Sequence, residues 1–233
     1  METKLLNQFR EIGKWYEFQR THPKVEYGDS LVKANQLFQS MLAKYGNDPG
    51  TLGFDFKALK KSGVSIVSSD DGLFRIYSWD TLLGGTMHIY YNVYQYKIRG
   101  KVWTKAIVTE NFDAGKLYSK IYTLYNDGKL YYLGIGNSVF STKDSRQGIS
   151  VFRINDVGLD DQVKLIKTKS GLTNKLSLDY DFFSVVDRPE RPVSLITYNK
   201  DSKMIKLALV DEKHRVTNKF ITYKFTGKYF ERL

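Results

Sequence analysis

The chain has 233 residues, of which 42% are hydrophobic and 15% aromatic, and it carries a formal net charge of +11. These values are typical of a folded protein that buries a sizeable core in one large or two small domains, and they exclude a disordered chain. Because cysteine is absent, disulfides, thiolate metal sites and a cysteine nucleophile are excluded as well.

The first part of the chain has helical periodicity. Residues 4–21 repeat apolar side chains at the spacing of one helix face. The His22-Pro23 pair ends this helix, because the residue before proline avoids the α region. A second helix is expected to begin at Asp29 or Ser30, whose short side chains accept hydrogen bonds from the first free amides. Gly46 would end it in the left-handed conformation that glycine tolerates.

A turn cluster, Asn47-Asp48-Pro49-Gly50, marks the best candidate for a domain boundary. A short helix or turn over Asp55–Lys61 follows, and from Gly63 onward the periodicity is that of strands. We therefore predict a helical segment over residues 1–62 and an antiparallel β domain over residues 63–233.

Short β-rich runs separated by turn signals fill the second unit. The expected strands are Val64–Ser68, Leu73–Asp80, Thr86–Ile98, Val102–Thr109, Leu117–Tyr125, Leu130–Ile135, Val139–Ser141, Ile149–Ile154, Val163–Lys167, Leu176–Val186, Val193–Tyr198, Met204–Val210, Thr217–Phe225 and Tyr229–Arg232. This spacing predicts a mainly β (α+β) fold, with the helical segment packed on an antiparallel β-sandwich, open barrel or propeller-like meander. A sandwich or open barrel is preferred, because the first four-strand group has no further copies to complete a propeller.

The most strongly patterned stretch is a hairpin. We expect Leu73–Asp80 and Thr86–Tyr96 to pair as antiparallel strands, because the five-residue connection between them ends in two glycines. Side chains alternate across a strand, so Tyr77 and Trp79 share one face. That face is predicted to lie in the core.

The other face of the hairpin is mixed. Pairing Asp80 with Thr86 would put Ser78 opposite His88, and a serine, a histidine and a carboxylate together suggest a hydrolase. No strained turn or oxyanion donors accompany them, so a polar cross-strand pair is favoured and no catalytic residue is predicted. The candidate binding residues are Ser78, Asp80, Gly84, Gly85, His88 and Tyr90.

Other chemistry finds little support in the sequence. With only three histidines and no metal-binding motif, no metal and no cofactor are expected. Asp179 and Asp181 would share a strand face, as a glycosidase pair requires, but turn and edge aspartates are the commoner case. Gly134-x-Gly136 is too short for a phosphate-binding loop.

Tyrosines are concentrated in the central strands. Aromatic sheet faces can stack on sugar rings or bases, although filling the core is the favoured interpretation. The residues concerned are Tyr90, Tyr91, Tyr94, Tyr96, Tyr118, Tyr122, Tyr125, Tyr131 and Tyr132. Lysines are dispersed without a basic block, so a solvated basic surface is favoured over nucleic-acid binding.

Ser68-x-Asp70-Asp71-Gly72-x-x-Arg75-Ile76-Tyr77-Ser78-Trp79-Asp80-Thr81-x-x-Gly84-Gly85-Thr86, with Val93-x-Gln95-Tyr96 after it, resembles a segment of a group of uncharacterised Gram-negative, Bacteroidetes-type bacterial proteins. The resemblance continues to the closing Tyr223–Glu231 stretch. It implies one fold across the β region and an exported or cell-envelope location. It implies no activity and no residue role.

Together these features predict a non-enzymatic binding or interaction protein of the bacterial cell envelope, whose partner is a protein or a glycan. The alternative is a hydrolase acting on a cell-surface or polymeric substrate. No run of about 18 apolar residues occurs, so no transmembrane segment is expected. The location would be periplasmic or envelope if a leader has been removed, and cytoplasmic otherwise.

Overall fold

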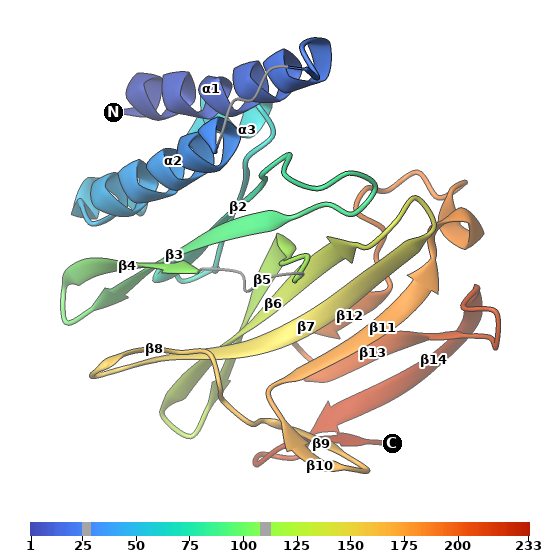
Figure 1. The fold of residues 1–233 in the computed structure, drawn as a ribbon. Helices are drawn as coiled ribbons and strands as arrows, with labels where there is room; N and C mark the ends of the chain where they lie inside the picture. Colours follow the sequence, from blue (N-terminus) through green and yellow to red (C-terminus); the bar gives the residue numbers. More distant parts are fainter. Residues whose placement is uncertain (25–28, 108–112) are drawn as a thin grey trace.

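Figure 1 shows the computed structural model of the chain, which describes residues 1–24, 29–107 and 113–233. The long helices lie over one face of a first sheet, and a second and a third sheet follow below it in layers. The fold is mainly β, with antiparallel sheets and a short helical region at the N-terminus. The predicted fold class is confirmed, and the second and third sheets form its sandwich.

The helical part is short. Its elements are α1 (Glu2–Thr21), α2 (Ser30–Gly46), a 3-10 turn η1 (Pro49–Thr51) and α3 (Lys57–Lys61). The first sheet runs in chain order and consists of β1 (Ser65–Ser68), β2 (Phe74–Asp80), β3 (Tyr90–Ile98) and β4 (Lys101–Ile107).

The second sheet has the order β11-β7-β6-β5. Its strands are β11 (Lys175–Asp181), β7 (Asp144–Asn155), β6 (Lys129–Val139) and β5 (Leu117–Asn126), and β8 (Gly158–Asp160) pairs with β7. The third sheet has the order β10 (Gly171–Thr173), β9 (Ile166–Thr168), β15 (Phe230–Arg232), β14 (Val216–Phe225), β13 (Met204–Val210) and β12 (Ile196–Asn199). A 3-10 turn, η2 (Phe182–Val185), follows β11.

The helices share a core with the first sheet. Leu5 and Ile12 of α1 and Phe38 of α2 are buried together with Tyr77 and Trp79, which are fully inaccessible to solvent. This arrangement confirms the predicted core face of β2. The division of the chain into a helical segment over residues 1–62 and a β domain over residues 63–233 stays a prediction.

Gly46 has a different role from the one predicted. It is the last helical residue, and the following cap residue Asn47 has an ordinary right-handed conformation. A Cβ at Gly46 would lie 2.6 Å from Thr104 Cγ2, and the Gly46 carbonyl accepts a hydrogen bond from Gln95 Nε2 at 2.6 Å. Glycine is needed here so that the helix end can approach the sheet closely. Asp29 stands at the N-cap of α2, but its side chain makes no capping hydrogen bond.

The other face of the first sheet packs against the second sheet. Phe74, Ile76 and Tyr94 meet Tyr132 and Phe152 in a separate, largely aromatic core. The third core lies between the second and third sheets. The second sheet is therefore covered on both faces. The candidate site described below lies where β3 and the end of β4 approach this sheet.

The hairpin register differs from the predicted one. Asp80 pairs with Tyr90 rather than Thr86, and Ser78 pairs with Asn92 rather than His88. The shift is four residues, because residues 81–89 form an irregular loop instead of extending the strand. An even shift keeps every side chain on its predicted face.

Several other strand boundaries differ from the prediction, and the short strands β8 and β10 were not predicted. The chain predicted as two strands over Leu130–Ser141 is the single strand β6. The strand predicted over Leu176–Val186 ends at Asp181, whose carboxylate accepts from the Phe183 amide and begins the 3-10 turn. β4 ends at Ile107, and the remainder of the strand predicted over Val102–Thr109 lies outside the described residues.

Candidate functional site

Ser78, the candidate nucleophile of the hairpin, is fully buried. Its Oγ accepts hydrogen bonds from Asn92 Nδ2 at 2.9 Å and from the Tyr118 amide at 3.2 Å. These partners join β2 to β3 and to the second sheet. The structure therefore does not bring Ser78 together with His88, and Ser78 occupies a structural position between two sheets.

Asp80, His88 and Tyr90 do lie together. His88 Nδ1 is 2.5 Å from Asp80 Oδ2, and the His88 ring stacks on the Tyr90 ring with centroids 6.0 Å apart. Burial, reinforced by the Asp80 carboxylate, raises the pKa of Tyr90 to about 12, so its hydroxyl stays protonated. His88 and Asp80 are partly exposed at the end of β2 over the buried Tyr90, and the role of the three residues in binding stays a prediction.

The two glycines of the loop differ in their surroundings. A Cβ at Gly84 would lie 1.8 Å from the Met87 carbonyl oxygen, so only glycine fits there. Gly85 is exposed with open space around it. Gly84 thus shapes the loop, and a contact of either glycine with a ligand stays a prediction.

The tyrosines form no broad exposed face. Of those named above, Tyr125 is exposed at 65%, whereas Tyr90, Tyr94, Tyr118, Tyr131 and Tyr132 are buried. The carboxylate pair also has structural partners, because Asp179 accepts two hydrogen bonds from the Arg146 guanidinium, and this lowers the pKa of Asp179. Among the described residues, no cluster of histidine and acidic side chains could hold a metal ion.

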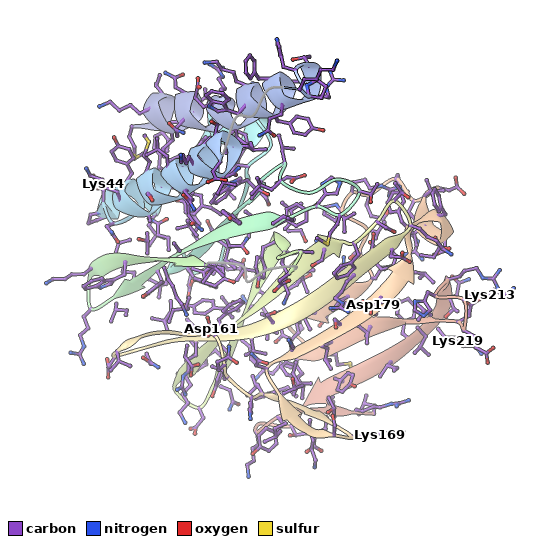
Figure 2. All side chains as sticks on the ribbon, in the orientation of Figure 1. Lys44, Asp161, Lys169, Asp179, Lys213 and Lys219 are labelled. Carbon is purple, nitrogen blue, oxygen red and sulfur yellow. The ribbon has the colours of Figure 1, made fainter. Side chains whose placement is uncertain are left out.

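A cleft opens between the first and second sheets, at the edge where β3 and β4 approach β5 and β7. Its volume is about 290 Å³. Figure 2 shows Asp161, one of its lining residues, beside β7 on the side facing the first sheet. The lining mixes polar and aromatic side chains, among them Asn92, Tyr94, Lys116, Tyr118, Ser150, Phe152, Asp161, Gln162, Asn174 and Lys175.

Lys116 is the most unusual of these residues. Its partly buried Nζ lies 2.9 Å from Ser150 Oγ, and Ser150 is itself buried. The aliphatic part of Lys116 lies over Gly136, where a Cβ would be 3.0 Å from Lys116 Cδ. Burial first, and then the charge of Lys175, lower the pKa of Lys116 to about 8.

Tyrosines and an ion pair form the rest of the cleft wall. The hydroxyls of Tyr94 and Tyr118 are 3.3 Å apart, and burial raises the pKa of each. Lys105 Nζ contacts Asp161 Oδ2 at 2.8 Å. Both tyrosine hydroxyls are therefore neutral hydrogen-bonding groups at physiological pH, and Asp161 already has a cationic partner.

None of the six binding residues predicted from the sequence lines this cleft. Lys116 precedes a predicted strand and looks like any other dispersed lysine, and Ser150 stands inside a buried strand. Two sequence features touch the site, namely the tyrosines Tyr94 and Tyr118 in its wall and Gly134-x-Gly136, whose glycines both allow close packing. A Cβ at Gly134 would lie 3.0 Å from Phe152 Cε2, and one at Gly136 would press on Lys116.

The comparisons add no relative. No protein-family model matches the chain, and no curated protein is significantly similar to it. In the described parts of the chain, no helix is long and apolar enough to cross a membrane.

Ser78→Ala tests the structural role of Ser78. The substitution leaves the buried Tyr118 amide without its acceptor, so we expect a loss of about 1–3 kcal/mol in the free energy of unfolding. Urea denaturation measures it, with the exposed Ser40→Ala variant as control. Equal stability of the two variants would contradict the role.

Lys116→Met tests the cost of holding a charge in the cleft. A pKa lowered from 10.5 to about 8 means that the folded protein disfavours the ammonium. The penalty is present below pH 8 and disappears as the pH rises toward 10.5. Lys116→Met should therefore be more stable than the parent by about 1–2 kcal/mol at pH 7, since burial is partial.

The difference in the free energy of unfolding between Lys116→Met and the parent should narrow as the pH rises from about 8 to 10.5, which urea denaturation at several pH values will show. Lys219→Met is the control, because Lys219 is an exposed residue of β14 that does not line the cleft, and Figure 2 shows it on the opposite side of the view from Asp161. A destabilised Lys116→Met protein at pH 7 would contradict the prediction.

Proposed function

We propose that the protein is a non-enzymatic binding protein and that the cleft between the first and second sheets holds its ligand. The supporting observation is the convergence of polar side chains from both sheets on one open cavity of about 290 Å³. Ligand sites are typically concave, with an apolar lining and a few polar groups that fix orientation. A placement in the bacterial cell envelope rests on the resemblance of the hairpin segment alone.

A glycan fits this site better than an apolar ligand. Hydroxyls of Ser150, Tyr94 and Tyr118 and the amides of Gln162 and Asn174 offer both donors and acceptors. Sugar hydroxyls need partners of both kinds. A segment of a partner protein remains the other occupant to test, because a peptide backbone can use the same groups.

The binding proposal is tested by NMR titration with a panel of oligosaccharides and short peptides. The side-chain amide signals of Asn92, Gln162 and Asn174 should shift together on binding, because all three line the cleft. Gln162→Trp, at the exposed rim, should abolish the shifts at Asn92 and Asn174, whereas Lys219→Trp should leave them unchanged. Shifts that survive in Gln162→Trp, or that map elsewhere, would place the ligand outside the cleft.

One observation favours the alternative, a hydrolase acting on a cell-surface or polymeric substrate. Lys116 Nζ lies within hydrogen-bond distance of Ser150 Oγ, as a general base lies beside a serine nucleophile. Neutral Lys116 would take the Ser150 proton while Oγ attacks a carbonyl carbon. Lys116 would then give that proton to the leaving group, and water would release the acyl group from Ser150.

The hydrolase alternative is tested by labelling with a fluorophosphonate probe. If it holds, Ser150 is labelled, the rate rises as the pH passes about 8 and Lys116 loses its proton, and Ser150→Ala is not labelled. Ser78→Ala should be labelled like the parent, since Ser78 is buried elsewhere. An unlabelled parent protein at pH 9 would exclude a reactive Ser150.

A further inference from the structure

We propose that the ligand of the cleft is an acidic sugar, and that the ammonium groups of Lys116 and Lys175 hold its carboxylate. The proposal rests on the binding function proposed above and names the chemical class of its ligand. It is carried by two cations that border one cavity and form no ion pair with any acidic residue that the structure describes.

Lys116 has a neutral partner only. In the described residues its ammonium donates to the Ser150 hydroxyl, and no carboxylate forms an ion pair with it. The Lys175 ammonium, from β11, has neither a hydrogen bond nor an ion pair within the same ranges of the chain. Partly buried charges are normally paired with an opposite charge, and a bound anion would give the Lys116 ammonium such a partner.

The carboxylates nearby are engaged elsewhere. Asp161 contacts Lys105 at 2.8 Å, and Asp179 is held by the Arg146 guanidinium. Asp113 is exposed, and its Oδ1 accepts from the Gly115 amide. The charge of Lys175 acts on Lys116 more strongly than that of Asp113 does. Within the described residues, Lys116 and Lys175 are therefore the lining cations that form no ion pair with a carboxylate.

The other lining groups favour a sugar over an acidic peptide. A carboxylate between the two lysines would leave the hydroxyls of Tyr94 and Tyr118 and the amides of Gln162 and Asn174 for ring hydroxyls. An aspartate or glutamate side chain has no hydroxyl beyond its carboxylate, so an acidic peptide could reach these groups only with its backbone. The volume of about 290 Å³ is at the small end for ligand pockets, which suits one sugar residue with the rest of a polymer outside.

Three charged groups act on the titration of Lys116, namely Lys175 from β11, Asp113 on its own segment and Arg146 from β7. Asp161 after β8 also lines the cleft, and the Tyr94 and Tyr118 hydroxyls stay neutral. A carboxylate ligand needs the charged form of Lys116. The affinity for this ligand should therefore fall as the pH rises through about 8. The rate of fluorophosphonate labelling of Ser150 under the hydrolase alternative should instead rise over the same pH interval.

The test compares methyl β-D-glucuronide with the corresponding uronamide, which has the same ring and no charge. NMR titration at pH 6.5 should show binding of the acid at least ~10-fold tighter than that of the amide, the change expected for one charge-assisted contact. Lys116→Met and Lys175→Met should each remove this preference, whereas Lys219→Met should keep it. Lys175 is exposed, so its substitution reports on binding without a risk to folding.

Each outcome decides a separate point. Equal affinity of acid and amide in the cleft would overturn the carboxylate inference and leave the binding function standing. Tighter binding of N-acetyl-aspartate amide than of the glucuronide, lost in Lys116→Met, would overturn the sugar in favour of an acidic peptide. Absence of NMR shifts at Asn92 and Asn174 with both the glucuronide and N-acetyl-aspartate amide would overturn the inference. The binding function would then be decided by the other oligosaccharides and peptides of the titration panel.

Discussion

The side-chain amide of Asn92 holds the first two sheets together. Its Nδ2 donates to Ser78 Oγ on β2 and to the Lys116 carbonyl before β5, each at 2.9 Å, and Ser78 in turn accepts from the Tyr118 amide. Buried polar groups are costly unless each is paired, so these bonds specify one relative position of the sheets. That position fixes the backbone at the Lys116 carbonyl and the Tyr118 amide, where the chain borders the cleft.

Much of the fold follows from local pattern, as the central hairpin shows. Tyr77 and Trp79 lie in the core because alternation places them on one face, and this holds in either register. The register itself depends on residues 81–89, where the His88 amide donates to the Val139 carbonyl and the Tyr90 amide to that of Ala114. Those are long-range contacts with the second sheet, and turn chemistry alone carries no information about them.

The candidate site shows the same limit more strongly. Ser78 is a candidate nucleophile by residue type, yet it does not line the cleft. Its Oγ accepts from the Asn92 side chain and the Tyr118 amide, and Asn92 also binds the Lys116 carbonyl. The cleft joins Asn92, Lys116, Ser150 and Asn174 from four separate parts of the chain. Residue type cannot separate Lys116 from the other lysines, because only the packing over Gly136 and the contact with Ser150 make it different.

The protonation state of Lys116 decides between binding and hydrolysis. With a pKa of about 8, the ammonium form accounts for about nine molecules in ten at pH 7. In that form the residue attracts an anion and cannot accept the Ser150 proton. A bound carboxylate would stabilise the ammonium further and suppress the nucleophile, whereas a neutral ester would not. The acidic ligand proposed above would thus keep Ser150 inactive, so the binding and hydrolase proposals require opposite protonation states of the same lysine.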